Sequence, residues 1–163
     1  MPSHHITVRP ITENDIDSLY DLIIAIARHH DQEQYVQTTP AKLRKGAFPS
    51  PPEIATFGAL LAEVTDAQGT SAIAGYASFT WNYSIWSGGN YMNIDDVFVW
   101  DEFRGQKVGE KLMLAARDLC KDKHVERLRW EVQQDNHKAI KFYRRLGARV
   151  DIKGVCKWAV ASE

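Results

Sequence analysis

The chain has 163 residues, a formal net charge of −1, 44% hydrophobic residues and 25% charged residues. This length predicts a single domain over residues 1–163, large enough to bury a core without disulfides or a structural metal. The ordinary composition excludes a disordered or collagen-like chain, and the balanced charge and short apolar stretches argue against a nucleic-acid or membrane partner.

The first half of the chain predicts two helices and a meander of strands. Residue alternation predicts a short strand at 6–9, and apolar residues at helical spacing predict a helix over 12–30. Thr39 before Pro40 is typical of a helix start and predicts a short helix to about residue 45. Three strands, separated by turn residues that favour antiparallel pairing, are expected at 57–64, 72–81 and 92–100.

The second half alternates helices and strands. A helix is expected over 109–121, a strand at 128–132, and a helix over 136–146 that Gly147 closes. Two final strands are expected at 150–152 and 155–160. The chain therefore predicts an α/β fold with a mixed, mostly antiparallel sheet of about six to seven strands and about four flanking helices.

Two cysteines and the first residues bear on the cellular compartment. Cys120 and Cys156 show no CxxC or metal-ligand spacing, so we expect reduced thiols and no metal site. The start of the chain does not read as a signal peptide, so a cytoplasmic location is expected.

The most informative segment runs from strand to helix over residues 95–110, DDVFVWDEFRGQKVGE. A glycine-containing turn that opens a helix presents backbone N–H groups and the positive end of the helix dipole to one point, which suits a phosphate. The spacing matches neither a Walker A loop nor a dinucleotide fingerprint. The alternative is a tight turn that needs glycine only for its conformation. The candidate phosphate-binding residues are Arg104, Gly105, Gln106, Lys107, Val108, Gly109 and Glu110.

A second segment, residues 136–148, reads NHKAIKFYRRLGA. Asn136 can cap the helix, and Tyr143 lies seven residues later, near the same face. The alternative for Tyr143 is a tyrosine that packs in the core.

Together the two segments resemble the GNAT acetyltransferase superfamily, in their order, their elements and their separation of about thirty residues. The resemblance implies a GNAT-like fold and a coenzyme A site made of residues 104–110, the backbone of Val97, Phe98 and Val99, and the side of the later helix that carries Asn136, Ala139 and Tyr143. The segments YSIW (83–86) and WEV (130–132) resemble the branch that holds the spermidine/spermine and thialysine N-acetyltransferases.

That resemblance implies an acetyl-CoA-dependent N-acetyltransferase in which a neutral primary amine attacks the thioester directly. An alkyl amine must first lose a proton, and Asp95, or Glu131 through water, is the expected acceptor. Backbone N–H groups near Phe98 and Val99 are expected to stabilise the thioester oxygen. Tyr143 is expected to donate a proton to the leaving thiolate, and no metal is needed.

The expected acceptor is a small molecule with a primary amine, and the branch implies a homodimer. Asp95, Asp96 and Glu131 would surround the amine, unless these carboxylates pair with Arg127 or Arg129 instead. The candidate substrate-binding residues are Asp95, Tyr83 and Trp86, whose rings could flank a cation, and His29 and His30 at the end of the first helix, which could equally be a solvated helix end.

Three departures from the branch bear on the acceptor. Lys107 stands where the family turn has glycine, which costs about 1–2 kcal/mol if the position needs a positive φ. Asp95 and Asp96 stand where the branch usually has Glu-Asp. The basic segment 149–157 argues against long polyamines.

Two other functions stay open. One is a protein N-terminal or lysine acetyltransferase, which needs an open peptide groove. The other is a non-catalytic acyl-CoA-binding domain of the same fold, which Lys107 and Asp95 would favour.

Overall fold

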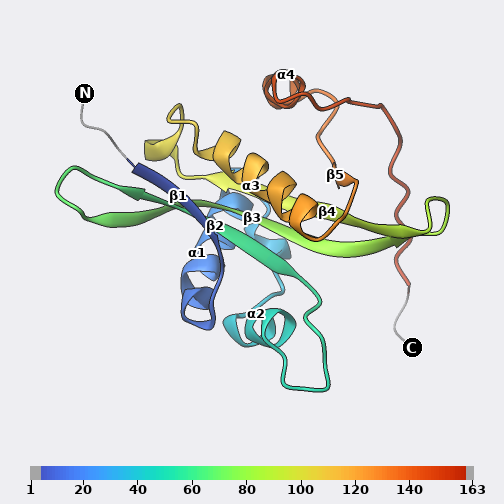
Figure 1. Ribbon diagram of the computed structural model, residues 1–163, viewed down its shortest axis with the longest axis horizontal. Helices are drawn as coiled ribbons and strands as arrows, with labels where there is room; N and C mark the ends of the chain where they lie inside the picture. Colours follow the sequence, from blue (N-terminus) through green and yellow to red (C-terminus); the bar gives the residue numbers. More distant parts are fainter. Residues whose placement is uncertain (1–4, 161–163) are drawn as a thin grey trace. The chain divides into compact units, whose positions relative to one another are not determined.

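The computed structural model describes residues 5–160 (Figure 1). The contacts of the chain divide it into two compact units, Met1–Trp130 and Glu131–Glu163.

The first unit is built on a five-stranded sheet in the order β1-β2-β3-β4-β5. The first four strands form an antiparallel meander, and β5 pairs parallel to β4. This confirms the expected α/β fold with a mixed, mostly antiparallel sheet. The strands are β1 (His5–Pro10), β2 (Gly58–Thr65), β3 (Ser71–Ser84), β4 (Gly89–Val99) and β5 (Leu128–Trp130).

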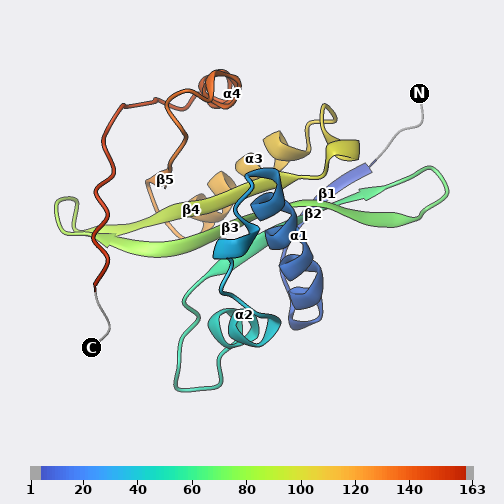
Figure 2. The ribbon, with the colours of Figure 1, turned by 180° about the vertical axis from the view of Figure 1, so that it is seen from behind.

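Helices cover both faces of this sheet. Figures 1 and 2 show α1 (Ile16–His29) and α2 (Pro40–Ala47) on one side and α3 (Val108–Asp122) on the other. The apolar face of α1 packs into a buried cluster with residues of β2, β3 and β4, and the buried face of α3 lies against the same strands from the opposite side. The α1 cluster includes Leu19, Leu22, Leu61, Tyr76 and Phe98. Among residues 5–160, no helix has the length and apolar character to cross a bilayer.

Short 3-10 helices lead into or out of these elements. They are η1 (Glu13–Asp15), η2 (Glu33–Tyr35) and η3 (Asp101–Phe103).

The second unit is organised around α4 (His137–Arg145). Asn136 caps this helix, because its side-chain oxygen accepts a hydrogen bond from the Ala139 amide at 3.1 Å. The end has two closing bonds, from the Gly147 amide to the Arg144 carbonyl and from the Ala148 amide to the Tyr143 carbonyl. The sequence therefore correctly predicted both ends of α4.

The two strands expected at 150–152 and 155–160 are wrong, so the sheet has five strands rather than six to seven. Residues 151–160 form no strand. Their large apolar side chains lie in solvent, with Ile152, Val155, Trp158 and Val160 all between 61% and 93% exposed. An apolar alternation forms a stable strand only when one face is buried and the backbone is paired, and neither condition holds for this segment.

The turn before α3 contains two residues with positive φ. Gly105 has φ 76°, and a Cβ built there would meet nothing within 4 Å. Lys107, the N-cap of α3, has φ 66° and ψ 15°, which is the left-handed region. A residue with a Cβ is strained in that region, so the chain holds a locally unfavourable residue at the start of α3.

Lys107→Gly is expected to raise the free energy of unfolding by about 1 kcal/mol, because glycine adopts this conformation without a steric penalty. Urea unfolding followed by circular dichroism measures the change. Lys107→Ala keeps the strain and loses only the charge, so its stability should stay near that of the wild type. An equal gain in both variants would contradict the conformational explanation.

A charged network ties β1 to β2 and to the entry of α1. Arg9 contacts both Oδ atoms of Asp15, at 2.8 and 3.0 Å, and Oε1 of Glu63 at 2.7 Å. Asp15 Oδ2 also accepts from the amide and hydroxyl of Thr12, at 2.7 and 2.8 Å. Asp15 is only 8% exposed, and the bonds from Arg9 in particular hold the pKa of its carboxyl far below the usual range.

Asp15→Asn is expected to destabilise the fold by roughly 1–3 kcal/mol at neutral pH, because it leaves the half-buried Arg9 with only one of its two carboxylate partners, Glu63. The pKa of Asp15 is lowered in the folded protein, so this stabilisation is complete above about pH 4 and is lost as the pH falls below it. Thermal unfolding between pH 2 and 7 should show the two proteins converging at low pH. Glu33→Gln removes the exposed pair with Arg28 and should leave the melting temperature unchanged.

Candidate active site

β4 stops pairing with β5 at the point where its own register with β3 is broken. The β4–β5 ladder runs from Met92↔Leu128 to Ile94↔Trp130. On the other side, Ile94 pairs with Phe79 but Asp96 pairs with Ser78, so Asp95 is an extra residue that forms a β-bulge. Beyond the bulge, β4 pairs with β3 alone among the described strands. An unpaired strand edge is therefore presented next to the bulge.

The unpaired edge carries the backbone groups of alternate β4 residues. The amide of Trp100, the residue after β4, donates a hydrogen bond to the Ala74 carbonyl of β3 at 2.9 Å. By the alternation of a strand, Val97 and Val99 then direct their backbone groups away from β3. Arg104 Nε donates to the Val99 carbonyl at 3.2 Å, which agrees with that direction. Phe98, the other expected donor, is in phase with Trp100 and directs its backbone toward β3.

Gly75 fixes how closely β3 approaches this part of β4. A Cβ at Gly75 would lie 2.3 Å from the Phe98 carbonyl oxygen, which no side chain could tolerate without moving the backbone. The lack of a side chain at Gly75 therefore allows the backbones of β3 and β4 to approach this closely at Phe98 and Val99.

The turn after β4 is tied down by its own side chains. Arg104 pairs with Asp101 at 2.9 Å, and the Gln106 side-chain amide donates to the Glu102 carbonyl at 3.0 Å. Lys107 makes no side-chain capping bond to α3. Helix geometry leaves the first amides of α3 without helical partners, so those of Val108 and Gly109 remain available to an anion. The candidate residues 104–110 thus fit a phosphate-bearing ligand such as coenzyme A.

Two adjacent carboxylates lie at the bulge in different environments. Asp95 is exposed, and its Oδ1 accepts from Asn93 Nδ2 at 2.8 Å. Asp96 is half-buried. Burial raises the pKa of both carboxyls above the usual range, and the charge of Asp96 raises the pKa of Asp95 further. The more enclosed carboxylate is Asp96, whereas the sequence analysis favoured Asp95.

The remaining expected catalytic residues belong to the second unit. Tyr143 lies on α4 with its ring 5.2 Å from that of Phe142, and burial raises the pKa of its hydroxyl. Asn136 uses its side-chain oxygen to cap the same helix at Ala139, and Glu131 is the first residue of the unit. The structure therefore brings together residues 95–110 in one unit, and residues 136–143 in the other.

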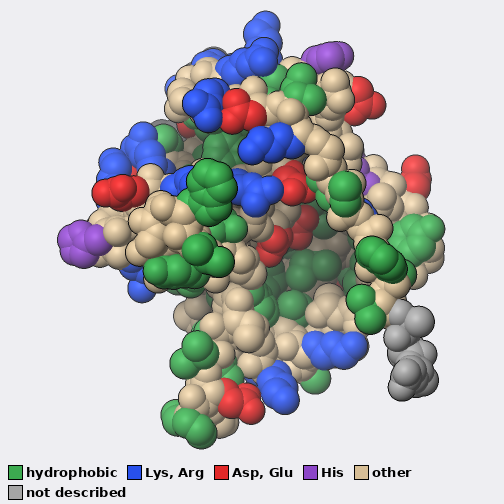
Figure 3. Space-filling model, turned by 90° about the vertical axis from the view of Figure 1, so that its right-hand side faces the viewer, with side chains coloured by type: hydrophobic (Ala, Val, Ile, Leu, Met, Phe, Trp, Pro, Cys, Tyr) green, Lys and Arg blue, Asp and Glu red, His purple; other side chains and the backbone are tan. Residues whose placement is uncertain are grey.

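The expected substrate-binding residues lie at two places in the first unit. His29 and His30 end α1 as an exposed pair with ring centroids 5.3 Å apart. Tyr83 and Trp86, in the β3–β4 hairpin, are 63% and 101% exposed. Figure 3 views the hairpin end of the molecule and shows hydrophobic side chains on its surface. Arg127, one of the alternative partners of the carboxylates, lies over the Tyr91 ring at 4.9 Å.

A groove of about 900 Å³ runs between α1 and the end of β4. Its lining combines aromatic rings with carboxylates: Tyr20, Asp21, His29, Phe98, Trp100 and Asp101 are among its residues. The lining also includes Arg28, which pairs with Glu33, so the groove carries charges of both signs beside its aromatic rings.

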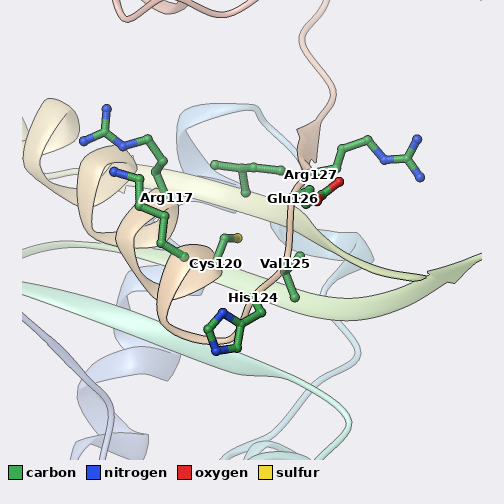
Figure 4. Close-up of a pocket in the computed structure, with 8 residues that line it drawn as sticks. Arg117, Cys120, His124, Val125, Glu126 and Arg127 are labelled. Atoms are coloured by element: carbon green, nitrogen blue, oxygen red, sulfur yellow. The ribbon is translucent and has the colours of Figure 1, made fainter. Parts of the chain in front are cut away.

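A second cavity of about 460 Å³ lies at the far end of α3, beside residues 124–128 (Figure 4). Its main cations do not converge, because Arg117 and Arg127 extend in opposite directions in Figure 4. It also lies about a helix length, roughly 20 Å, from the turn at the start of α3. We therefore place the candidate active site at the bulge and the turn.

Sequence reasoning did not single out Tyr76 or Gly75 as site residues. Both lie on β3 opposite residues of β4, so their neighbours depend on strand register. The alternation of β3 could have shown that Tyr76 points into the α1 face, but not that it lies beside Asp96.

The amino-acid sequence is similar to those of known acetyltransferases. The profile of the Acetyltransferase (GNAT) family matches residues 16–148. A thialysine N-epsilon-acetyltransferase from Sus scrofa is 30% identical over 147 residues, which is 88% of this chain and 84% of that protein. A putative [ribosomal protein bS18]-alanine N-acetyltransferase from Bacillus subtilis is 36% identical over 75 residues, 46% of each chain.

Solved structures show the same fold. The crystal structure of an aminoglycoside acetyltransferase from an uncultured soil metagenomic sample superimposes with a TM-score of 0.76 at 17% sequence identity, and covers 96% of this chain and 97% of that one. The family profile extends from α1 through the bulge and the turn to the end of α4. The chain therefore belongs to the GNAT family of acetyltransferases.

Proposed function

We propose that the chain transfers the acetyl group of acetyl-CoA to a primary amine of a small molecule. The observation that carries this proposal is the coincidence of three features: the bulge at Asp95, the unpaired edge of residues 97–99, and the uncapped start of α3. Together they place two carboxylates, backbone hydrogen-bond donors and the free amides at the start of α3 along one short stretch of chain. Acetyl-CoA would supply the thioester, whose carbonyl carbon receives the amine nitrogen.

Each residue has a distinct role in this proposal. The amides from Gly105 to Gly109 hold the diphosphate of the coenzyme, and backbone donors of Val97 and Val99 stabilise negative charge on the thioester oxygen. Asn136 and Ala139 on α4 are further proposed coenzyme-binding residues. Tyr143 donates a proton to the leaving thiolate; its raised pKa keeps it protonated at neutral pH.

The acceptor is proposed to be a small amine bound near the carboxylates of Asp95 and Asp96, with Glu131 as the alternative proton acceptor. Relatives that match over most of the chain are named thialysine N-epsilon-acetyltransferases, and a structural neighbour is named an aminoglycoside acetyltransferase; each name gives a small molecule as the acceptor. A pair of carboxylates suits a cationic substrate, whereas the exposed rings of Tyr83 and Trp86 lie in the β3–β4 hairpin, several ladder positions from the bulge.

Protein N-terminal acetylation is the second candidate. The Bacillus subtilis relative named as an alanine N-acetyltransferase of a ribosomal protein favours it, at higher identity but over less than half of the chain. The longer match to the thialysine enzymes gives preference to the small-molecule acceptor.

We further propose that residues 1–163 act as one domain and that the chain forms a homodimer. The family profile spans both units, which supports the single domain. Of the aromatic residues in β3 and its hairpin, Tyr76 and Phe79 fill the core, whereas Tyr83 and Trp86 are exposed and available to a second copy.

An acceptor screen tests the proposed function. The protein is incubated with acetyl-CoA and thialysine, lysine, spermidine, an aminoglycoside or peptides with free N-termini, and free thiol and acetylated product are both measured. We expect acetylation of short amines with a lysine-like chain above that of spermidine. Acetylation of peptides alone would overturn the small-molecule acceptor, and absence of any acetylated product would overturn the enzyme assignment of this site.

Gly109→Glu is expected to weaken coenzyme A binding at least tenfold, because it adds a carboxylate where the helix amides meet the diphosphate. Titration calorimetry with coenzyme A measures the affinity. Lys121→Gln changes the net charge by the same amount at the other end of α3, and should bind normally. If Gly109→Glu and the wild type bound coenzyme A with equal affinity, the diphosphate would not bind at this turn.

Tyr143→Phe is expected to lower kcat by roughly 10²–10⁴-fold, the usual contribution of a positioned general acid, with the fold intact. Steady-state kinetics with saturating acetyl-CoA measures the loss, and circular dichroism checks the fold. Tyr35→Phe removes a hydroxyl from an exposed tyrosine and serves as the control. Turnover of Tyr143→Phe near that of the control would leave Tyr143 with a packing role only.

A further inference from the structure

Lys107 lies at the junction between the turn after β4 and α3, and its backbone conformation is unfavourable there. It is the N-cap of α3, with φ 66° and ψ 15°, and a residue with a Cβ is strained in this left-handed region. Gly105, two residues earlier, has a φ of 76° without that penalty because it has no Cβ. Local conformation therefore does not explain why a lysine occupies this position.

A lysine also cannot cap the helix that it begins. N-cap residues are usually serine, threonine, aspartate or asparagine, whose side-chain oxygen accepts a hydrogen bond from an amide of the first turn. Thr39 and Asn136 cap α2 and α4 in this way. A lysine ammonium group has three donors and no acceptor, and Lys107 makes no capping bond to α3. The first amides of α3 are therefore left free for an anion rather than occupied by the N-cap side chain.

The other charges of the turn do not favour an anion. Residues 101–110 have a net charge of −1, from three carboxylates (Asp101, Glu102 and Glu110) and two cations (Arg104 and Lys107). The guanidinium group of Arg104 is held by Asp101 at 2.9 Å and by the Val99 carbonyl at 3.2 Å. Lys107 forms no ion pair or side-chain hydrogen bond with any residue in the described range 5–160. Lys107 is thus the cation of this turn that can respond to a ligand.

Lys107 is also covalently adjacent to the free amides. Its carbonyl carbon is bonded to the amide nitrogen of Val108, the first residue of α3, so the side chain starts beside the place where an anion would bind. Its four-carbon stem is flexible and carries a compact positive charge. The turn faces open space at Gly105, where an added Cβ would meet nothing within 4 Å. An anion bound to the first amides of α3 would therefore lie within reach of the Lys107 ammonium group.

We propose that the ammonium group of Lys107 is the counter-ion of the coenzyme A diphosphate. This proposal rests on the proposed use of acetyl-CoA, and it gives the Lys107 side chain a role separate from that of the turn amides. The amides orient the diphosphate, Arg104 holds the turn together, and Lys107 offsets the nearby carboxylates with a charge-assisted hydrogen bond. The family turn has glycine at this position, so the family alone does not imply this contact.

The strain at Lys107 then has a functional explanation. In the free protein, the residue is in an unfavourable conformation and places a cation at the end of the helix dipole that favours anions. A bound diphosphate converts that cation into a partner. Lys107 therefore lowers the stability of the free protein and strengthens the binding of the coenzyme.

Isothermal titration calorimetry with coenzyme A tests this role in Lys107→Gln and Lys107→Arg. Lys111→Gln is the matched control, because Lys111 is an exposed lysine one helical turn further along α3 and its loss changes the net charge equally. Lys107→Gln should weaken coenzyme A binding about tenfold, and Lys107→Arg should keep most of the affinity. Lys111→Gln should change the affinity by no more than about twofold, because solvent screens the more distant charge.

Lys107→Gly separates binding from stability. It removes the charge and the strain together, so the free energy of unfolding should rise while the affinity for coenzyme A falls about tenfold. A residue with only a structural role would not produce these opposite changes. If Lys107→Gly bound coenzyme A as tightly as the wild type, the proposal would be wrong.

Dephosphocoenzyme A identifies the phosphate group that Lys107 contacts, because it keeps the diphosphate and lacks the 3′-phosphate of the ribose. The loss of affinity in Lys107→Gln should be the same with this ligand as with coenzyme A. A loss seen with coenzyme A alone would assign Lys107 to the 3′-phosphate and overturn the diphosphate contact. High salt should narrow the difference between Lys107→Gln and the wild type, because it screens exposed charges.

The remaining outcomes separate this contact from the proposed function. Unchanged affinity in Lys107→Gln, or an equal loss in Lys107→Gln and Lys111→Gln, would overturn the role of Lys107 and leave acetyl transfer intact. A wild-type protein that bound no coenzyme A would overturn both the contact and the proposed function. In steady-state kinetics, Lys107→Gln should raise the KM for acetyl-CoA and leave kcat unchanged, because the diphosphate takes no part in bond formation.

Discussion

The end of pairing between β4 and β5 at Ile94 is the constraint from which the candidate site follows. A strand paired on both edges has no backbone groups to offer a ligand, and a flat strand without the bulge would keep Asp95 and Asp96 on opposite faces of a continuous ladder. The extra residue at Asp95 bends β4 at the place where its partner ends. The unpaired edge that results leads directly into η3 and the turn before α3, so backbone donors, the carboxylates and the helix start lie along fewer than twenty residues.

The surrounding elements hold this stretch from both faces. On one face the cluster around Leu19, Tyr76 and Phe98 fixes β4 against α1, and on the other the buried side of α3 packs against the same strands. Gly75 allows the backbones of β3 and β4 to come close enough for this packing. Lys107 lies in the exposed turn after β4, and Val108, the residue that follows it, is buried.

The positive end of the α3 helix dipole and the carboxylates at the bulge lie at separate places along the chain. The start of α3 favours an anion, while the bulge carries the carboxylates of Asp95 and Asp96. Both carboxyls at the bulge have raised pKa values because of burial, which makes them responsive to a nearby cation.

Local signals in the amino-acid sequence correctly predicted the α/β class, the antiparallel meander, the caps of α4 and the segment that opens α3. These features depend on local signals, such as residue alternation, helix spacing, and Asn136 and Gly147 at helix ends, which act within a few residues along the chain. The strands expected at 150–152 and 155–160 carried a local apolar signal too, but a strand also needs a paired backbone and a buried face, and local pattern cannot supply either. The distinction between Asp95 and Asp96 likewise required tertiary structure, because one bulge residue decides which carboxylate faces α1. Tyr76 and Asp96 are 20 residues apart in the sequence, and only strand register brings them to the same face of the sheet.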